Sequence, residues 1–226
     1  MSSAADPKAI PRERRIRITE IYASVQGEST HAGKPCVFVR LTGCPLRCTW
    51  CDSEFTFTGG IVRDLDDVVA EATAHGIHTI EVTGGEPLVQ PTAIPLMQRL
   101  LDLGHEVLLE TSGGVSIEGV PSEVHTILDV KCPDSGESHR NLWENLDHLS
   151  DRGELKFVIA SEADYRWSRD QIRGRGLEGR WPLLLSPAWG LCAPEDLVTW
   201  MLQDGLNARL GLQLHKVVWP PDARGV

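Results

Sequence analysis

The sequence predicts an α/β fold, a partial, modified TIM-type barrel of parallel strands with outer helices, in a single domain spanning residues 1–226. Segments with the pattern of a strand alternate with segments with the pattern of a helix, as in parallel βαβ units. Polar, glycine-rich segments follow the strands, and the chain is long enough to build one ordinary core. A doubly wound open sheet fits the same alternation.

The first expected elements are two strands followed by a helix. Residues 17–25 and 36–41 are rich in β-branched and apolar side chains, and they flank a glycine-containing segment. Residues 64–75 carry apolar side chains at helical spacing, with aspartates in the first turn and Gly76 just beyond the end. This spacing predicts a helix.

The alternation continues toward the C-terminus. The further expected strands are residues 79–82, 106–109, 126–130, 155–159, the short apolar run 183–185 and a last strand at 209–214. The further expected helices are residues 93–103, 141–149, 163–172 and 195–203. About six parallel strands with helices outside them would make the barrel.

Five polar or glycine-rich segments follow strands in this scheme. They are residues 43–53, 83–87, 110–114, 131–136 and 186–190. Because function in such folds lies beyond the carboxyl ends of the strands, we expect the five loops to converge on one face and to hold the functional site.

The charge of the chain argues against two classes of partner. Lys and Arg number 22 against 32 Asp and Glu, which gives a formal net charge of −10. An acidic chain without a basic tract is not attracted to a phosphate backbone or an anionic membrane, so we expect neither nucleic acid nor membrane as a partner. The polar arm 1–15 has no apolar core, and no later segment reaches the ~20 apolar residues of a membrane span. A cytoplasmic protein is therefore expected.

Three of the six cysteines lie within eight residues. Cys44, Cys48 and Cys51 form a C-x3-C-x2-C pattern, which fits a metal site in a reducing compartment better than a disulfide framework. In a [4Fe-4S] cluster, three cysteines leave one iron open to another ligand. A structural zinc site completed by His31, Cys36 or a distant residue is the alternative.

The cysteine spacing, with Trp50 just before the last cysteine, resembles the signature of the radical S-adenosylmethionine (SAM) enzymes. Residues 83–87, Thr-Gly-Gly-Glu-Pro, are similar to a second, glycine-rich motif of that family, although alone they would predict a turn before a helix. The resemblance implies that SAM binds the open iron and yields a 5′-deoxyadenosyl radical, with Trp50 near the adenine.

Other segments resemble one family of radical SAM enzymes, the 7-carboxy-7-deazaguanine synthases, over nearly the whole chain. The similar segments are residues 21–29, 32–35, 37–40, 51–53, 110–113, 129–131, 154–156 and 213–216. The resemblance implies a lyase that converts 6-carboxy-5,6,7,8-tetrahydropterin to 7-carboxy-7-deazaguanine, on the route to queuosine, with loss of ammonia and regeneration of SAM. The implied cofactors are a [4Fe-4S] cluster, SAM and Mg²⁺.

The resemblance also implies a role for individual residues. The substrate contacts would be Val25, Gln26, Gly27, Glu28, Arg40, Thr83, Glu110 and His215, with Glu28, Arg40, Glu110 and His215 as the catalytic residues. The SAM contacts would be Trp50, Asp52, Gly84, Gly85, Glu86, Ser112, Asp129, Lys131, Ser186 and Ala188. Cys44, Cys48 and Cys51 would hold the cluster, and Ser53, where the family usually has threonine, would hold Mg²⁺.

Two of these side chains have the chemistry needed to bind a pterin ring that carries a carboxylate. Glu28 can accept two N–H donors from the aminopyrimidinone edge, with Gln26 beside it. Arg40 can form a bidentate pair with the carboxylate. Without the resemblance, Arg40 would be interpreted as a surface ion pair and a lone His215 as structural.

The resemblance further implies a homodimer and a one-electron reductant such as flavodoxin. The tail 216–226 continues past the point at which short members of the family end, so the group that replaces their terminal carboxylate in the substrate site stays open. An activating enzyme for a glycyl radical protein is an alternative with the same cysteine loop, and a non-catalytic zinc or iron–sulfur module is another.

Overall fold

In the computed structural model of the chain, which describes residues 10–226, nine strands form one sheet. The strands are β1 (Arg15–Val25), β2 (Pro35–Leu41), β3 (Ile61–Asp64), β4 (Thr79–Gly84), β5 (Glu106–Thr111), β6 (His125–Val130), β7 (Glu154–Ile159), β8 (Leu183–Pro187) and β9 (Arg209–Leu210). Their order is β3-β1-β2-β4-β5-β6-β7-β8-β9, so β3 and β9 are free edges and the sheet does not close. Residues 1–9 of the predicted arm lie outside the described part.

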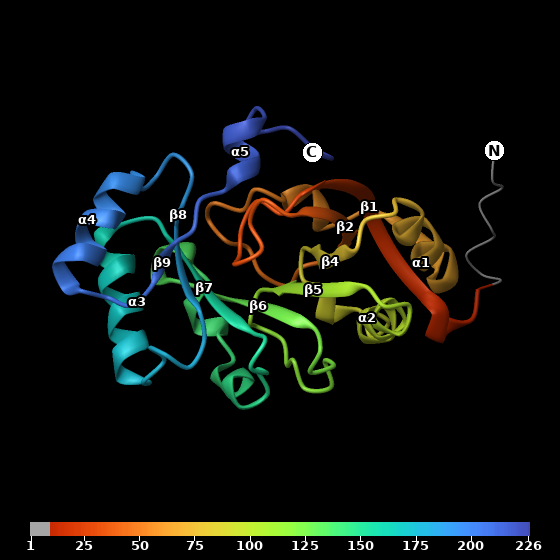
Figure 1. Cartoon of the computed structure of the whole chain (residues 1–226), viewed down its shortest axis with the longest axis horizontal. Helices are drawn as coiled ribbons and strands as arrows, with labels where there is room; N and C mark the ends of the chain where they lie inside the picture. The colour runs from red at the N-terminus through yellow and green to blue at the C-terminus, as the bar shows by residue number, and fades with distance from the viewer. Residues whose placement is uncertain (1–9) are drawn as a thin grey trace.

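Five α-helices accompany the sheet within residues 10–226. They are α1 (Leu65–Ala74), α2 (Ala93–Asp102), α3 (Glu162–Gly174), α4 (Pro194–Asp204) and α5 (Leu214–Val218). Figure 1 shows α1 and α2 together at one end of the sheet and α3 and α4 at the other, with α5 apart from both pairs. None of these helices has the length and the apolar character that crossing a membrane requires.

Local sequence explains where the long helices begin. The side chain of Asp64 accepts a hydrogen bond from the backbone N–H of Asp66 at the start of α1, and Ser161 accepts one from Asp164 at the start of α3. Gly205 ends α4 in a left-handed conformation, with φ of 57°.

The two faces of each parallel strand have different roles. Ile80 and Val82 of β4 belong to the hydrophobic core, which lies against α1 and α2 in one half of the molecule and against α3 and α4 in the other. Glu81 and Thr83 alternate with them along the strand and line a cavity on the opposite face. The same alternation places charged side chains of β5, β6 and β7 on that cavity face.

The predicted α/β fold with a largely parallel sheet and outer helices is confirmed, and the parallel run extends from β2 to β9. The first two predicted strands, however, are antiparallel to each other. The segment that joins them is too short for the crossover that parallel strands need. β3 was not predicted; it is a four-residue edge strand that pairs antiparallel with β1.

Two expected elements in the second half of the chain are present but shorter than predicted. Residues 141–149 form a 3-10 helix at Trp143–Asp147 rather than an α-helix, because buried Asn145 uses its side chain to bind the backbone of Gly113, Val115 and Ile117. The last strand ends at Leu210, and residues 214–218 form α5 instead. There the backbone N–H of Leu214 donates to Gly27 O at 2.8 Å, which draws the chain away from the sheet.

Candidate active site

A cavity of about 790 Å³ lies over the carboxyl ends of the parallel strands. Each of the five predicted loop segments contributes residues to its wall, which confirms that they converge. The loop after β1, helix α5 and the tail 221–226 complete the wall. A volume of this size is in the range of small-molecule sites.

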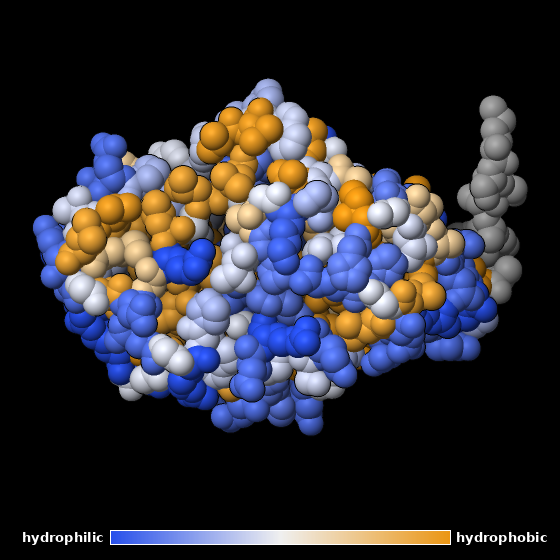
Figure 2. Space-filling view, viewed as in Figure 1, coloured by the Kyte–Doolittle hydropathy of each residue, from blue (hydrophilic) through white to orange (hydrophobic). Residues whose placement is uncertain are grey.

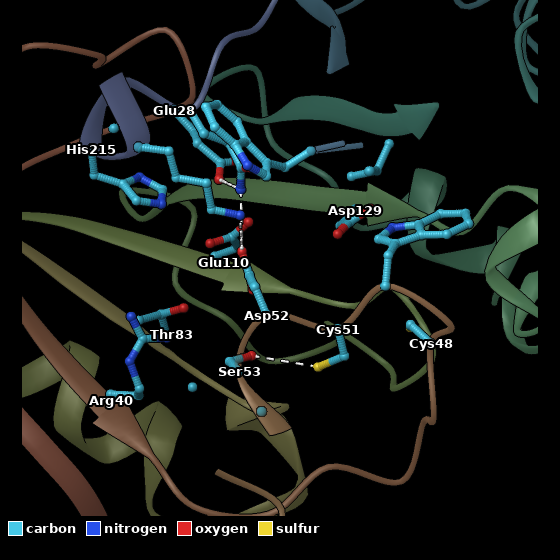
Figure 3. A pocket seen from close by; sticks show the side chains of 18 of the residues that line it. Glu28, Arg40, Cys48, Cys51, Asp52, Ser53, Thr83, Glu110, Asp129 and His215 are labelled. Atoms are coloured by element: carbon cyan, nitrogen blue, oxygen red, sulfur yellow. Dashed lines mark hydrogen bonds and ion pairs between the residues drawn. The ribbon is translucent and has the colours of Figure 1, made fainter. Parts of the chain in front are cut away.

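The cavity brings together all the predicted site residues except Glu86. The predicted residues that line it are Val25, Gln26, Gly27, Glu28, Arg40, Cys44, Cys48, Trp50, Cys51, Asp52, Ser53, Thr83, Gly84, Gly85, Glu110, Ser112, Asp129, Lys131, Ser186, Ala188 and His215. In Figure 3, Cys48 and Cys51 lie toward one end of the cavity, and Arg40 and His215 lie toward the other.

Glu86 lies behind the wall rather than in it. Its side chain is fully buried and accepts hydrogen bonds from the hydroxyl of Thr111 at 2.9 Å and from the backbone N–H of Ser112 at 2.7 Å. It also accepts one from the N–H of Leu88 at 2.9 Å. Glu86 therefore ties the 83–87 segment to the end of β5, and its geometry is that of a structural carboxylate.

The cysteine loop is held by neighbouring loops. The backbone N–H of Thr49 donates to Ser135 O at 3.1 Å, and the N–H of Arg47 donates to Glu137 at 2.7 Å. Cys44, Cys48 and Cys51 are free and partly exposed. His31 and Cys36, the residues considered as a fourth zinc ligand, do not line this cavity.

Within residues 10–226, no group of three or more His, Cys, Asp or Glu side chains is arranged so that it could hold a single metal ion. Each of three cysteines on one loop can hold one iron of a [4Fe-4S] cluster. Cys51 Sγ lies 3.7 Å from Ser53 Oγ, so the hydroxyl predicted to hold Mg²⁺ is next to the last cysteine.

Gly84 and Gly85 are required by close packing under the cysteine loop. Gly84 has φ of 149°, and a Cβ there would lie 2.3 Å from Leu41 O. A Cβ on Gly85 would lie 2.5 Å from Gly43 O and 2.7 Å from the Cβ of Cys44. The glycines of the second motif thus allow β4 to approach the segment that carries the first motif.

A chain of charges crosses the middle of the cavity. Lys156 Nζ lies 2.7 Å from Glu28 Oε2 and also donates to Glu110 Oε1. Lys131 Nζ lies 2.7 Å from Asp129 Oδ2. Figure 3 shows Glu110 between the arginine end and the cysteine end of the site. Five charged side chains thus meet on one face of the sheet, as one group of three around Lys156 and one pair.

Their surroundings push the pKa values of the two glutamates in opposite directions. Burial alone would raise the pKa of Glu28, but the charge of Lys156 and hydrogen bonds from Lys156 and Gln213 lower it below its usual value. The pKa of Glu110 is raised, because burial and the charge of Glu28 outweigh the effect of Lys156. Glu28 is therefore the more firmly ionised of the two.

Gln26 is buried and already engaged. Its Nε2 donates to Glu81, and its Oε1 accepts from the backbone N–H of Glu28 at 2.7 Å. Burial and the charge of Glu110 raise the pKa of Glu81 well above its usual value. Gln26 thus fixes the loop that carries Glu28 to the floor of the cavity.

Arg40 is not the surface ion pair of the alternative interpretation. Its Nε donates to Glu20 at 2.8 Å and its Nη2 donates to the hydroxyl of Tyr22 at 2.9 Å, with the side chain 17% exposed. A guanidinium has five N–H donors, so these two bonds leave others for a ligand in the cavity.

Helix α5 and the tail lie over the loop after β1. Gln213 Nε2 donates to Glu28 Oε1 at 2.8 Å, and Lys216 Nζ lies 2.9 Å from Asp52 Oδ2. A Cβ on Gly27 would lie 2.4 Å from His215 Nδ1, so the helix packs directly on this glycine. Burial lowers the pKa of His215, which favours the neutral imidazole.

Several residues of the cavity were not among the predicted site residues. Lys156, Glu81 and Gln213 contact predicted residues, and Arg224 of the tail stacks its guanidinium 4.1 Å from the ring centre of Phe55. Glu81 and Lys156 each lie inside a buried strand, at a position that faces the cavity. A buried charge inside a core strand is the sequence signal that points to them.

Comparisons with known proteins agree with this geometry. Residues 38–130 match the model of the radical SAM superfamily. The 7-carboxy-7-deazaguanine synthase of Koribacter versatilis is 47% identical over 93% of this chain and its own full length. That of Chlorobaculum tepidum is 42% identical, with 95% of this chain and 99% of the relative covered.

A solved structure supports the fold. QueE from Escherichia coli superposes with a TM-score of 0.74 at 21% identity, covering 89% of this chain and 95% of that one. At this identity the likeness concerns the fold alone, whereas the two relatives are similar to this chain over nearly its whole length. The chain belongs to the 7-carboxy-7-deazaguanine synthase family of radical SAM enzymes.

Proposed function

We propose that this chain is a carbon–nitrogen lyase that converts 6-carboxy-5,6,7,8-tetrahydropterin to 7-carboxy-7-deazaguanine and releases ammonia. The observation that supports it most is that one cavity joins three free cysteines to an arginine and two carboxylates suited to a planar, anionic ring. Family membership supports the same reaction. The product would serve the synthesis of queuosine.

The residues at the cysteine end fit a [4Fe-4S] cluster and SAM. Cys44, Cys48 and Cys51 offer three thiolates, and the buried Oδ1 of Asp129 has no hydrogen-bond partner in the described part of the chain, although Oδ2 contacts Lys131. When bound, the cluster and SAM supply the radical that removes a hydrogen atom from the substrate.

Other side chains around these groups would hold SAM in place. We assign Trp50, Asp52, Gly84, Gly85, Ser112, Asp129, Lys131, Ser186 and Ala188 to that wall. Glu86 acts behind them by fixing the end of β5. Asp129 and Lys131 form their own ion pair, so the wall presents a net neutral pair of charges to the zwitterionic end of SAM.

The opposite end would bind the pterin. Glu28 accepts two N–H donors of the aminopyrimidinone edge, since its carboxylate has lone pairs beyond those used by Lys156 and Gln213. Arg40, held by Glu20 and Tyr22, pairs with the substrate carboxylate.

Four further residues would complete this end of the site. They are Val25, Thr83, Glu110 and His215. The hydroxyl of Ser53 would supply one oxygen to Mg²⁺, and the substrate and water would supply the others. Gly27 permits the close packing of α5 that brings His215 into the cavity wall.

We also propose a cytoplasmic homodimer that accepts electrons from a one-electron reductant such as flavodoxin. All six cysteines are free, which supports a reducing compartment. Figure 2 shows hydrophobic side chains gathered over α4 and α5, where Leu202, Val217 and Val218 are 61–77% exposed. Apolar side chains in such number on one face support an interface there, and light scattering at several concentrations would test the dimer.

The activity itself is tested with the reconstituted enzyme. After anaerobic assembly of the cluster, the protein is incubated with 6-carboxytetrahydropterin, SAM, Mg²⁺ and a one-electron reductant, and the products are followed by mass spectrometry. We expect 7-carboxy-7-deazaguanine, ammonia and little net consumption of SAM. Cleavage of SAM with untouched pterin would instead favour an activating enzyme, and bound zinc with inert SAM would remove the enzymatic proposal.

Glu28→Ala tests the substrate end of the cavity independently of the cofactor end. We expect the variant to keep the cluster and to cleave SAM without coupling to substrate, while product formation falls at least about 100-fold, because the ring loses its acceptor. Iron content, 5′-deoxyadenosine and product are measured in the same reaction. An unchanged rate of product formation would remove Glu28 from the substrate site.

A further inference from the structure

The buried ammonium group of Lys156 lies between three carboxylates in the middle of the cavity. Its Nζ lies 2.7 Å from Glu28, donates to Glu110 and is 4.0 Å from Asp129. The side chain is only 6% exposed. The three acids come from the loop after β1, from β5 and from β6, so elements far apart in the sequence meet at a single ammonium group.

The three carboxylates do not depend on Lys156 equally. Asp129 has a second cation, since Lys131 lies 2.7 Å from its Oδ2. Glu110 has Lys156 as its ion-pair partner among the described residues, and Glu28 has Lys156 and the neutral amide of Gln213. Lys156 therefore acts mainly on the two acids at the substrate end.

We propose that Lys156 is a positioning residue that holds Glu28 and Glu110 in the orientation in which they receive the pterin. The inference rests on the function proposed above and adds a residue to it. Two buried carboxylates this close repel each other, and without the ammonium one of them would take up a proton or turn away. A protonated Glu28 has fewer acceptor positions for the N–H donors of the ring.

The charges that face Lys156 support this role. Besides its three neighbouring acids, the buried Glu81 of β4 adds a further carboxyl group, and Lys131 adds a cation on the SAM side. The charges of Glu110, Glu28 and Asp129 raise the pKa of Lys156 well above its usual value despite burial, so it stays charged. In return it lowers the pKa of Glu28.

Lys156→Met tests the proposal, with Lys156→Arg as the charge-retaining control. We expect Lys156→Met to keep the cluster and the affinity for SAM within about twofold, while KM for the pterin rises roughly 30-fold or more and kcat changes less. Lys156→Arg should recover most of the affinity. An unchanged KM in Lys156→Met would overturn the proposal.

The pH dependence of kcat/KM provides a readout that a purely structural role would not move. Removing the ammonium raises the pKa of Glu28, so the acid limb of the kcat/KM profile should shift to higher pH in Lys156→Met. The loss of kcat/KM relative to wild type should therefore become smaller as pH rises. Lys156→Arg should keep the wild-type limb. A defect of equal size at every pH would contradict the proposal.

A charge-balanced pair of variants covers the case in which Lys156→Met does not fold. Glu110→Gln is compared with Glu110→Gln combined with Lys156→Met, because the double variant keeps the net charge of the native cluster. The affinity for the pterin is measured by anaerobic absorbance titration without reductant. It should be at least tenfold weaker in the double variant than in Glu110→Gln. Equal affinities would refute the role of Lys156. Failure of the wild-type enzyme to convert the pterin would instead refute the proposed function.

Discussion

The cysteine end and the glutamate end of the cavity are built in different ways. The cysteine end comes from two short motifs, residues 44–51 and 83–87, that lie on adjacent strand ends and meet through glycine backbone. The glutamate end joins Glu28 to Lys156, 128 residues away, and to Gln213, 185 residues away. One end is therefore encoded locally, and the other is assembled by the whole sheet.

This difference predicts that the two ends of the cavity respond differently to substitution. A change at the cysteine end removes a ligand or a packing position that no other segment supplies. A change at the glutamate end disturbs a network in which Glu28 retains Gln213 when Lys156 is lost, and Asp129 retains Lys131. We therefore expect the largest effects at the first end and graded effects at the second.

Cys48→Ala should have the largest effect. Loss of one of three cluster ligands should abolish the iron–sulfur absorbance and lower both SAM cleavage and product formation at least about 100-fold. Cys192→Ala is the matched control, because Cys192 is a buried cysteine in the core near α4 and does not line the cavity. If Cys48→Ala retained cluster and SAM cleavage, the cysteine end would not be the cofactor site.

The same contrast explains how much could be predicted from the sequence. The cysteine loop and residues 83–87 are each short and contiguous, so their resemblance to the radical SAM motifs could be recognised in the sequence. Lys156 and Glu81 were missed because each is one residue inside a strand, and its partners lie on other strands or in the loop after β1. The order of the strands in the sheet decides which residues become neighbours. The sequence pattern predicted about six parallel strands but not their order.

The errors in the fold have a similar cause. The alternation of strands and helices follows from local periodicity and was correct for most of the parallel run. The antiparallel pairing of β1 with β2 follows from the short segment that joins them, whereas the turn of the chain from β9 into α5 depends on a contact with a distant residue, Gly27. Tertiary contacts of this kind override local propensity.

Gly85→Ala should have an intermediate effect. Its new methyl group would lie 2.5 Å from Gly43 O and 2.7 Å from the Cβ of Cys44, so the cysteine loop has to shift. We expect about 1–3 kcal/mol lower free energy of unfolding and a lower yield of cluster. Urea unfolding before reconstitution and iron content afterwards measure the two effects.

Gly174→Ala provides the control for this substitution. Gly174 is the last residue of α3, and a Cβ there would meet no atom within 4 Å. Alanine should leave the cluster yield unchanged and keep or slightly raise the stability. Equal losses in both variants would mean that the close approach under the cysteine loop is unimportant.

Glu106→Gln should have the smallest effect, because it acts on the glutamate end only through the loop after β1. Glu106 lies at the start of β5 and accepts hydrogen bonds from Thr79 at 2.7 Å and, at 3.1 Å, from His31 of that loop. Burial opposes ionisation of Glu106, but these bonds and the charges of His31 and Lys34 lower its pKa to about 2.

A lowered pKa means that the ionised carboxylate stabilises the fold above its ordinary pKa of 4.5 and that this contribution is lost as pH falls toward 2. Because Glu106 is partly exposed, we expect Glu106→Gln to cost about 1 kcal/mol or less near neutral pH. The difference in urea unfolding from wild type should narrow as pH falls below about 5. A constant difference between pH 7 and pH 4 would show that the charge of Glu106 does not anchor the loop. The glutamate end would then owe its position to Gln26, Lys156, α5 and the hydrogen bonds from Thr30 to Glu154.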